Sequence, residues 1–186
     1  MTTSQITEIQ KRIGTNPDGF WGPKSIAAVQ KHLRSLMPKN NPWPKSDQKS
    51  LTEFYGRPGD DSKLVVIEVG GLGVKYDGQS VHSIRCHAKV ASSLHRILVR
   101  LSQTFPEVLA KYAGCYNNRP MRGGSLPSLH ARGAAIDLAP EENGNLVPWP
   151  VQATMPLGVM EEFAKEGWLS AGAFWNRDSM HHQATQ

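Results

Sequence analysis

The 186-residue sequence has no apolar run of about 18 residues or more, and no basic segment followed by an apolar one at its start. A membrane-spanning helix needs roughly 20 predominantly apolar residues, so we expect no membrane span. A secretory signal peptide needs the basic and apolar regions in that order, so we expect none here. The chain should therefore accumulate in the cytoplasm of the cell that makes it.

Cysteine is also scarce: the two residues, Cys86 and Cys115, lie far apart and neither belongs to a Cys-x-x-Cys pair. Zinc–thiolate sites need closely spaced cysteines, so this kind of metal site is not expected. Two distant cysteines in a cytosolic chain are more often reduced than bridged. We interpret both as small buried residues rather than as a disulfide.

The chain has a modest excess of positive charge, with 21 Lys and Arg against 16 Asp and Glu, or +5 at pH 7. This sign favours an anionic polymer as partner. Because the basic residues are scattered and no nucleic-acid-binding motif is present, we expect no nucleic-acid partner. Two explanations stay open: attraction to the phosphates and carboxylates of a bacterial envelope, or a basic surface kept for solubility.

Two helices are predicted at the N-terminus. Three isoleucines share one face of the first helix, which covers residues 4–13 and ends at Gly14. The second begins at Pro23, carries an apolar stripe, and ends before Pro38. Residues 38–50 contain three prolines and no periodicity, which predicts a semi-rigid linker.

The remaining residues, 51–186, alternate short apolar segments with amphipathic ones. The predicted strands cover 64–69, 81–87, 134–139 and 181–184. The predicted helices cover 88–102, 106–113 and 156–167, while 140–150 and 168–178 are expected to be connections. Because no β-α-β repeat is visible, we predict an α+β fold with a small antiparallel sheet and flanking helices.

The residues best suited to chemistry lie near 128–137 and near the C-terminus. His130 precedes Asp137 by seven positions, and Asp178 precedes His181 by three. Two imidazoles and one carboxylate make a three-ligand zinc set that leaves a fourth position for water, and the other carboxylate is then available as a general base. Alternatively, His130 is a loop residue bonded to backbone and Asp178 a turn residue. Asp137 follows an apolar run, where an unpaired carboxylate would be costly.

The first of these segments matches the pattern Ser-x-His-x-x-Gly-x-Ala-x-Asp at Ser128, His130, Gly133, Ala135 and Asp137. With a second motif, an acidic residue followed three positions later by His, it resembles the VanY-type D-alanyl-D-alanine carboxypeptidase family of zinc peptidases. That family includes phage endolysins that cleave the L-alanyl-D-glutamate bond. The resemblance covers about residues 50–185.

The resemblance implies a role for each of these side chains. His130, Asp137 and His181 would bind Zn²⁺, Asp178 would be the catalytic base, and Ser128 would help to hold the substrate.

An arginine upstream of the first motif usually contacts a substrate carboxylate or the developing oxyanion in this family. Two residues qualify here, Arg119 and Arg122, and we prefer Arg119. Position 182 is usually a bulky apolar residue in relatives but is His182 here, which could compete as a ligand or donate a hydrogen bond to one. Neighbours on a strand point to opposite faces, so we expect only His181 to face the metal.

Part of the N-terminal segment resembles the small helical peptidoglycan-binding module found on many wall hydrolases. The matching residues are Asp18, Gly19, Trp21, Gly22, Ser25, Ala28 and Val29. The usual module has three helices and the first part is short here, so a two-helix cap on the catalytic domain is the alternative.

Taken together, we expect a peptidoglycan-binding module at 1–37, a linker at 38–50 and a zinc peptidase domain at 51–186. The predicted protein is a monomeric, endolysin-like hydrolase of phage type, held in the host cytoplasm until it is released to the wall. Its predicted reaction is cleavage of the L-alanyl-D-glutamate bond of peptidoglycan. The alternatives are a D-alanyl-D-alanine carboxypeptidase and a non-catalytic wall-binding protein; a zinc amidase would act on the same wall but lacks these motifs.

Overall fold

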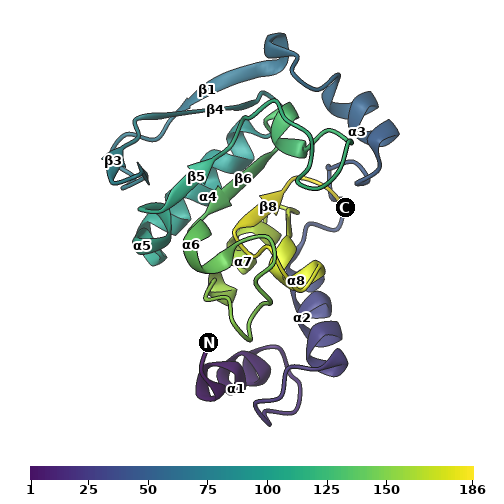
Figure 1. Ribbon diagram of the computed structural model, residues 1–186, viewed down its shortest axis with the longest axis vertical. Coiled ribbons are helices and arrows are strands. Elements are labelled where there is room, and N and C mark those ends of the chain that lie inside the picture. Colours follow the sequence, from purple (N-terminus) through teal and green to yellow (C-terminus); the bar gives the residue numbers. More distant parts are fainter.

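The computed structural model describes all residues, 1–186. Helices α1 (Thr3–Arg12) and α2 (Pro23–Leu36) lie at one end of an elongated molecule, and the paired strands at 64–68 and 83–87 lie at the other (Figure 1). Both helices have the predicted bounds to within one or two residues. None of the helices is long and apolar enough to cross a membrane.

A four-stranded antiparallel sheet forms the middle of the molecule. Its strands are β5 (Tyr112–Gly114), β6 (Ala135–Leu138), β8 (His181–Gln183) and β7 (Leu169–Ser170), in that spatial order. Helix α4 (Ala91–Thr104) lies behind β5 and β6 in Figure 1, and it also packs against α7 (Leu157–Ala164). This arrangement confirms the predicted α+β class with a small antiparallel sheet.

Two further strand pairs lie outside this sheet. Strand β1 (Leu64–Glu68) pairs with β4 (Ser83–His87). Between them, β2 (Lys75–Tyr76) and β3 (Gln79–Ser80) form a tight hairpin whose two turn residues, Asp77 and Gly78, both have positive φ. This hairpin was not predicted from the sequence, although Asp-Gly is the dipeptide that such turns favour.

Several predicted boundaries were wrong. The helix expected over 106–113 ends early: α5 covers Pro106–Leu109, and the chain then becomes β5, because Tyr112 and Gly114 pair with β6. The expected connections contain short elements, namely α6 (Pro140–Asn143), β7 and α8 (Ala171–Phe174). The remaining elements are α3 (Gln48–Tyr55), which begins within the predicted linker, and the 3₁₀ turns η1 (Asp61–Lys63) and η2 (Leu129–Arg132).

One continuous hydrophobic core joins the N-terminal helices to the sheet. It includes Val29 and Leu33 of α2 together with Phe163 of α7. Trp43, from the Pro-rich segment, is also buried; its indole packs edge-on against Trp168, with ring centroids 6.2 Å apart. The prolines therefore lie in a segment that is anchored by an aromatic side chain.

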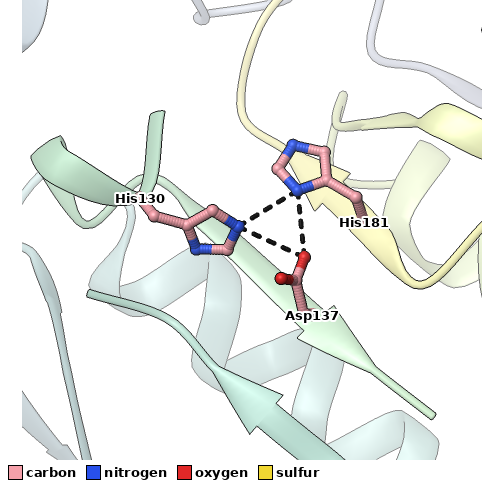
Figure 2. Close-up of side chains that lie close together, drawn as sticks. All are labelled: His130, Asp137 and His181. Atoms are coloured by element: carbon pink, nitrogen blue, oxygen red, sulfur yellow. Dashed lines mark hydrogen bonds and ion pairs between the residues drawn. The ribbon is translucent and has the colours of Figure 1, made fainter. Parts of the chain in front are cut away.

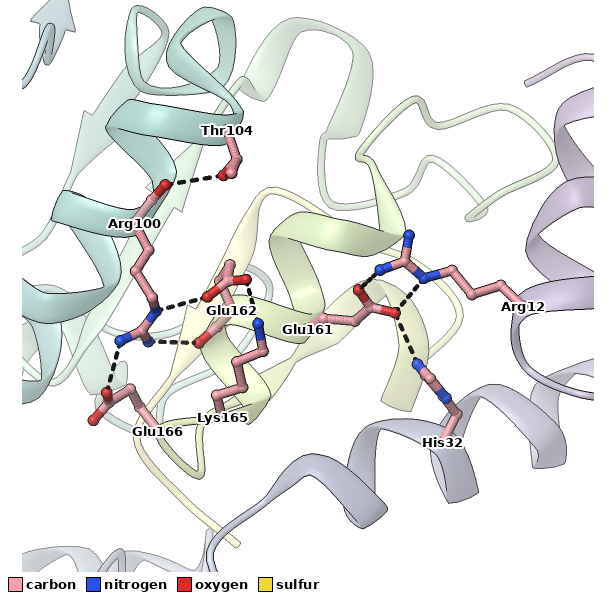
Figure 3. A network of polar contacts seen from close by, with 8 residues as sticks. All are labelled: Arg12, His32, Arg100, Thr104, Glu161, Glu162, Lys165 and Glu166. Carbon is pink, nitrogen blue, oxygen red and sulfur yellow. Dashed lines mark hydrogen bonds and ion pairs between the residues drawn. The ribbon is translucent and has the colours of Figure 1, made fainter.

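Helix α7 is tied on two sides by ion pairs (Figure 3). The buried carboxylate of Glu161 accepts hydrogen bonds from Arg12 of α1 and from His32 of α2, the latter at 2.8 Å. The next residue, Glu162, accepts a hydrogen bond of 2.6 Å from Arg100 of α4. Adjacent glutamates thus connect α7 to the N-terminal helices on one side and to α4 on the other.

Candidate metal centre

Local geometry explains why the first motif needs its serine and glycine. Ser128 caps the η2 turn, because its Oγ accepts a hydrogen bond of 3.3 Å from the backbone N–H of His130. Gly133 ends the turn in the left-handed region, at φ 65°. A Cβ atom at Gly133 would lie 2.8 Å from the backbone nitrogen of His87, so a larger residue would force the turn away from β4. The two residues fix how His130 enters the site.

The sheet brings the other two predicted ligands together. Asp137 of β6 and His181 of β8 are direct cross-strand partners, and His130 reaches them from η2 (Figure 2). Asp137 Oδ1 lies 3.2 Å from His130 Nε2 and 3.0 Å from His181 Nδ1, and the two ring nitrogens are 3.1 Å apart. Tetrahedral zinc with bonds of roughly 2.0–2.1 Å separates its ligand atoms by about 3.3 Å, so these three atoms match the spacing of a metal shell.

The outer nitrogens of both imidazoles face acceptors. His130 Nδ1 donates to the carbonyl oxygen of Cys115 at 2.7 Å, and His181 Nε2 donates to Gln183 Oε1 at 3.1 Å. Since each neutral imidazole carries one N–H, the inner nitrogens present lone pairs. Two lone pairs and a carboxylate oxygen then face one another in a buried site, an arrangement that repels itself unless a cation lies among them. The donor set therefore fits a divalent metal ion.

Asp178, the predicted base, lies beside this cluster. Its backbone has a positive φ of 58°, and its Oδ1 is buried without a hydrogen-bond partner. Burial raises the pKa of this carboxyl, and the nearby charge of Asp137 acts in the same direction. An acceptor that no protein group satisfies is suited to receive a proton from water or substrate.

The cluster opens into a cavity of about 410 Å³. All three predicted substrate-binding residues, Arg119, Arg122 and Ser128, line it, although Ser128 also caps η2. Seven further lining residues were not predicted: Met121, Leu129, Asn145, Trp175, Arg177, Met180 and Gln183. Of these, Trp175 alone had a visible signal, because it is an aromatic residue three positions before Asp178.

A second cavity, of about 290 Å³, lies on the other side of the cluster. It shares His130, Asp137 and the two arginines with the first cavity, and it does not include Asp178 or His181. Tyr76, Gly114 and other residues of the β2–β5 region form the rest of its wall.

His182 takes no part in the cluster. Its ring stacks on Phe163 with centroids 3.9 Å apart and an interplanar angle of 2°, and its Nδ1 lies 2.8 Å from Ser170 Oγ. Burial lowers the pKa of His182 to about 3, so the imidazole is neutral at physiological pH. His182 thus occupies the core side of β8, while His181 faces the cavity.

A buried asparagine that was not among the predicted site residues holds the Asp178–His181 segment. Asn143 Oδ1 accepts hydrogen bonds from Met155 N–H at 2.7 Å and Ser179 Oγ at 2.9 Å, and its backbone carbonyl accepts one from Met180 N–H at 3.0 Å. Asn143 is 1% exposed. It therefore fixes the two residues that separate the predicted base from the predicted ligand.

Comparison with known proteins links this segment to one family. No curated protein and no solved structure matches the chain significantly. Residues 122–184, about a third of the chain, match the family model described as D-alanyl-D-alanine carboxypeptidase. The match includes His130, Asp137, Asp178 and His181, and it begins at Arg122, so Arg119 lies outside it. The segment that builds the candidate metal centre is therefore similar to the D-alanyl-D-alanine carboxypeptidase family.

Proposed function

We propose that the protein is a zinc-dependent peptidase that hydrolyses the stem peptide of bacterial peptidoglycan. The observation that carries this proposal is the donor set itself. His130, Asp137 and His181 direct three electron-pair donors at one point, and the unpartnered carboxylate of Asp178 lies next to them. Three ligands and a free acid are typical of a catalytic zinc site, whereas structural zinc sites are closed by four protein ligands.

When bound, zinc would polarise the scissile carbonyl and lower the pKa of water at its open position. Asp178 Oδ1 would take a proton from the attacking water and deliver it to the leaving amine. The guanidinium groups of Arg119 and Arg122, which line both cavities, orient substrate carboxylates and offset the charge that develops on the carbonyl oxygen. Ser128 holds the η2 turn and lines the larger cavity.

The bond we propose is L-alanyl-D-glutamate, as in an endopeptidase that acts on the polymer. The second candidate is a D-alanyl-D-alanine carboxypeptidase, which the description of the matching family favours. The two reactions use the same centre and differ in where the substrate lies across it, so only the products distinguish them.

We also propose that residues 1–37 bind the wall. The amide of the buried Gln10 organises the loop between α1 and α2: its Nε2 donates to Asp18 Oδ1 at 3.0 Å and to the Phe20 carbonyl at 2.9 Å. This arrangement leaves the Phe20 ring 72% exposed, where it is available to a ligand. Loss of peptidoglycan co-sedimentation in Phe20→Ala, with hydrolysis of soluble fragments unchanged, is the expected result; unchanged co-sedimentation would remove this role.

An endolysin of phage origin, monomeric and retained in the host cytoplasm until lysis, is the biological setting that we propose. Its partner is the peptidoglycan of the host wall.

Digestion of purified peptidoglycan, with and without a chelator, tests the activity. Mass spectrometry should find new N-terminal D-glutamate that disappears with chelator; release of free D-alanine would instead identify the carboxypeptidase. Asp178→Asn should bind zinc and lose turnover, while Glu53→Gln, a matched change at an exposed carboxylate outside the site, should retain it. Zinc and wall binding without any new termini would favour a non-catalytic wall-binding protein.

A further inference from the structure

The two cavities meet at the candidate metal centre and differ in one chemically important respect. Asp178 lines only the larger cavity, whereas Arg119, Arg122, His130 and Asp137 line both. A peptide whose scissile bond lies at the cluster would therefore extend into a different cavity on each side of that bond.

The position of the base decides which half of the substrate enters which cavity. The proton that Asp178 carries must reach the leaving nitrogen, and transfer requires hydrogen-bond distance. The leaving amine and the residues that follow it must therefore lie in the larger cavity, with Asp178. The acyl half, which precedes the scissile bond, is left for the smaller cavity.

The smaller cavity has an aromatic wall on an anchored support. Tyr76 belongs to the β2–β3 hairpin, is 54% exposed, and packs edge-on against Tyr112 of β5, with ring centroids 6.4 Å apart. Gly114 of β5 has φ 129°, and a Cβ atom built there would meet nothing within 4 Å. The space beside this edge strand is thus open, and one face of it is aromatic.

We propose that the smaller cavity binds the glycan-linked, acyl end of the substrate, and that Tyr76 is a specificity-determining residue that selects muropeptides over free stem peptides. This inference rests on the proposed function, because L-alanine is the acyl residue of the proposed bond and is joined through a lactyl ether to the amino sugar. An exposed aromatic ring offers a flat apolar surface to the carbon–hydrogen face of a sugar.

Two soluble substrates with the same scissile bond test the proposal: a disaccharide-linked muropeptide and the corresponding free stem peptide. Relative to the wild type, Tyr76→Ala should lower kcat/KM for the muropeptide roughly threefold to tenfold, mainly through KM, and leave the free peptide within about twofold. Tyr76→Phe keeps the ring and should resemble the wild type. Gln79→Ala, which changes the cross-strand partner of Tyr76 in the same hairpin but lines neither cavity, is the matched control.

Equal losses on both substrates, or no loss on either, would overturn the role of Tyr76. If the wild type cuts neither substrate, the proposed function fails, and titration calorimetry with zinc-loaded protein decides the cavity assignment separately. Muropeptide binding that is weakened by Tyr76→Ala but not by Gln79→Ala would support the assignment. Absent or unaffected muropeptide binding would overturn it.

Discussion

Asn143→Ala should be among the most damaging single substitutions outside the ligand set. The side chain is 1% exposed and joins three segments: its Oδ1 accepts from Met155 N–H and Ser179 Oγ, and its Nδ2 donates to the Ala139 carbonyl at 2.9 Å. Two further hydrogen bonds, to the backbone N–H and the Oγ1 of Thr154, involve an exposed residue. Alanine at this position removes all five bonds and leaves the three partner groups on the buried residues without a replacement.

The expected loss of stability follows from counting those groups. A buried polar group that loses its partner costs about 1–3 kcal/mol, and three groups on buried residues lose theirs; the exposed Thr154 can bond to water instead. Water entering the vacated space would satisfy part of this demand, so we expect the free energy of unfolding to fall by roughly 3–5 kcal/mol. Ser179→Ala removes only one of these bonds and should cost about 1 kcal/mol.

Urea denaturation monitored by tryptophan fluorescence measures these differences, with Asn40→Ala, an exposed asparagine, as the control. Zinc affinity of the folded variant should fall as well, because Ser179 and Met180 connect Asp178 to His181. A loss below about 1 kcal/mol for Asn143→Ala, or a loss no larger than that of Ser179→Ala, would refute the reasoning that Asn143 holds this segment.

Three further predictions concern the ligand support and the packing of α7. Gln183→Leu removes the acceptor for the outer N–H of the ligand His181, and zinc affinity measured by calorimetry should fall about 10–100-fold; an unchanged affinity would contradict it. Glu161→Gln weakens the contact with α1 and should lower the free energy of unfolding by about 1–2 kcal/mol, a modest value because the Arg12 partner is 60% exposed; a urea midpoint equal to that of the wild type would count against this contact. Burial alone would raise the pKa of Glu166, but hydrogen bonds from Arg96 and Arg100 bring it below its ordinary value of 4.5. The unfolded state therefore binds more protons than the folded state in this acid range, and the stabilisation from ionised Glu166 is present above pH 4.5 and is lost as the pH falls through the folded pKa. The melting temperature of Glu166→Gln should therefore fall less steeply than that of the wild type as the pH is lowered through this range. An equal dependence of melting temperature on pH in both proteins would show that the contacts of Glu166 with Arg96 and Arg100 contribute little.

The parts of the site that could be predicted from the sequence are those encoded within a few residues. Ser128 and Gly133 shape the η2 turn through a cap and a positive φ, and both have a local sequence signature. Asp137 follows a run of apolar residues that predicts a buried strand. Strand alternation also separates His181 from His182 correctly, since the structure places the two rings on opposite faces of β8.

The parts that could not be predicted depend on contacts between distant segments. The acceptor that orients His130 is the backbone carbonyl of Cys115, and a carbonyl leaves no trace in the residue type. Asn143 lies in a segment that was expected to be a plain connection, and nothing nearby in sequence indicates that it meets Ser179. The β2–β3 hairpin was missed because each of its strands is only two residues long, too short for the run of alternating residues that usually identifies a strand.

The order of the sheet explains how these separate pieces form one centre. Neighbouring strands β5, β6 and β8 each bring a component: the Cys115 carbonyl follows directly after β5, Asp137 lies on β6, and β8 carries His181 together with Gln183. Because Asp137 and His181 are register partners, a slip of one residue between β6 and β8 would turn one of the two side chains to the opposite face. The same slip would expose the ring of His182, which now stacks on Phe163 in the core. Burial of an aromatic stack on one face of β8 therefore maintains the register on which the ligand geometry of the other face depends.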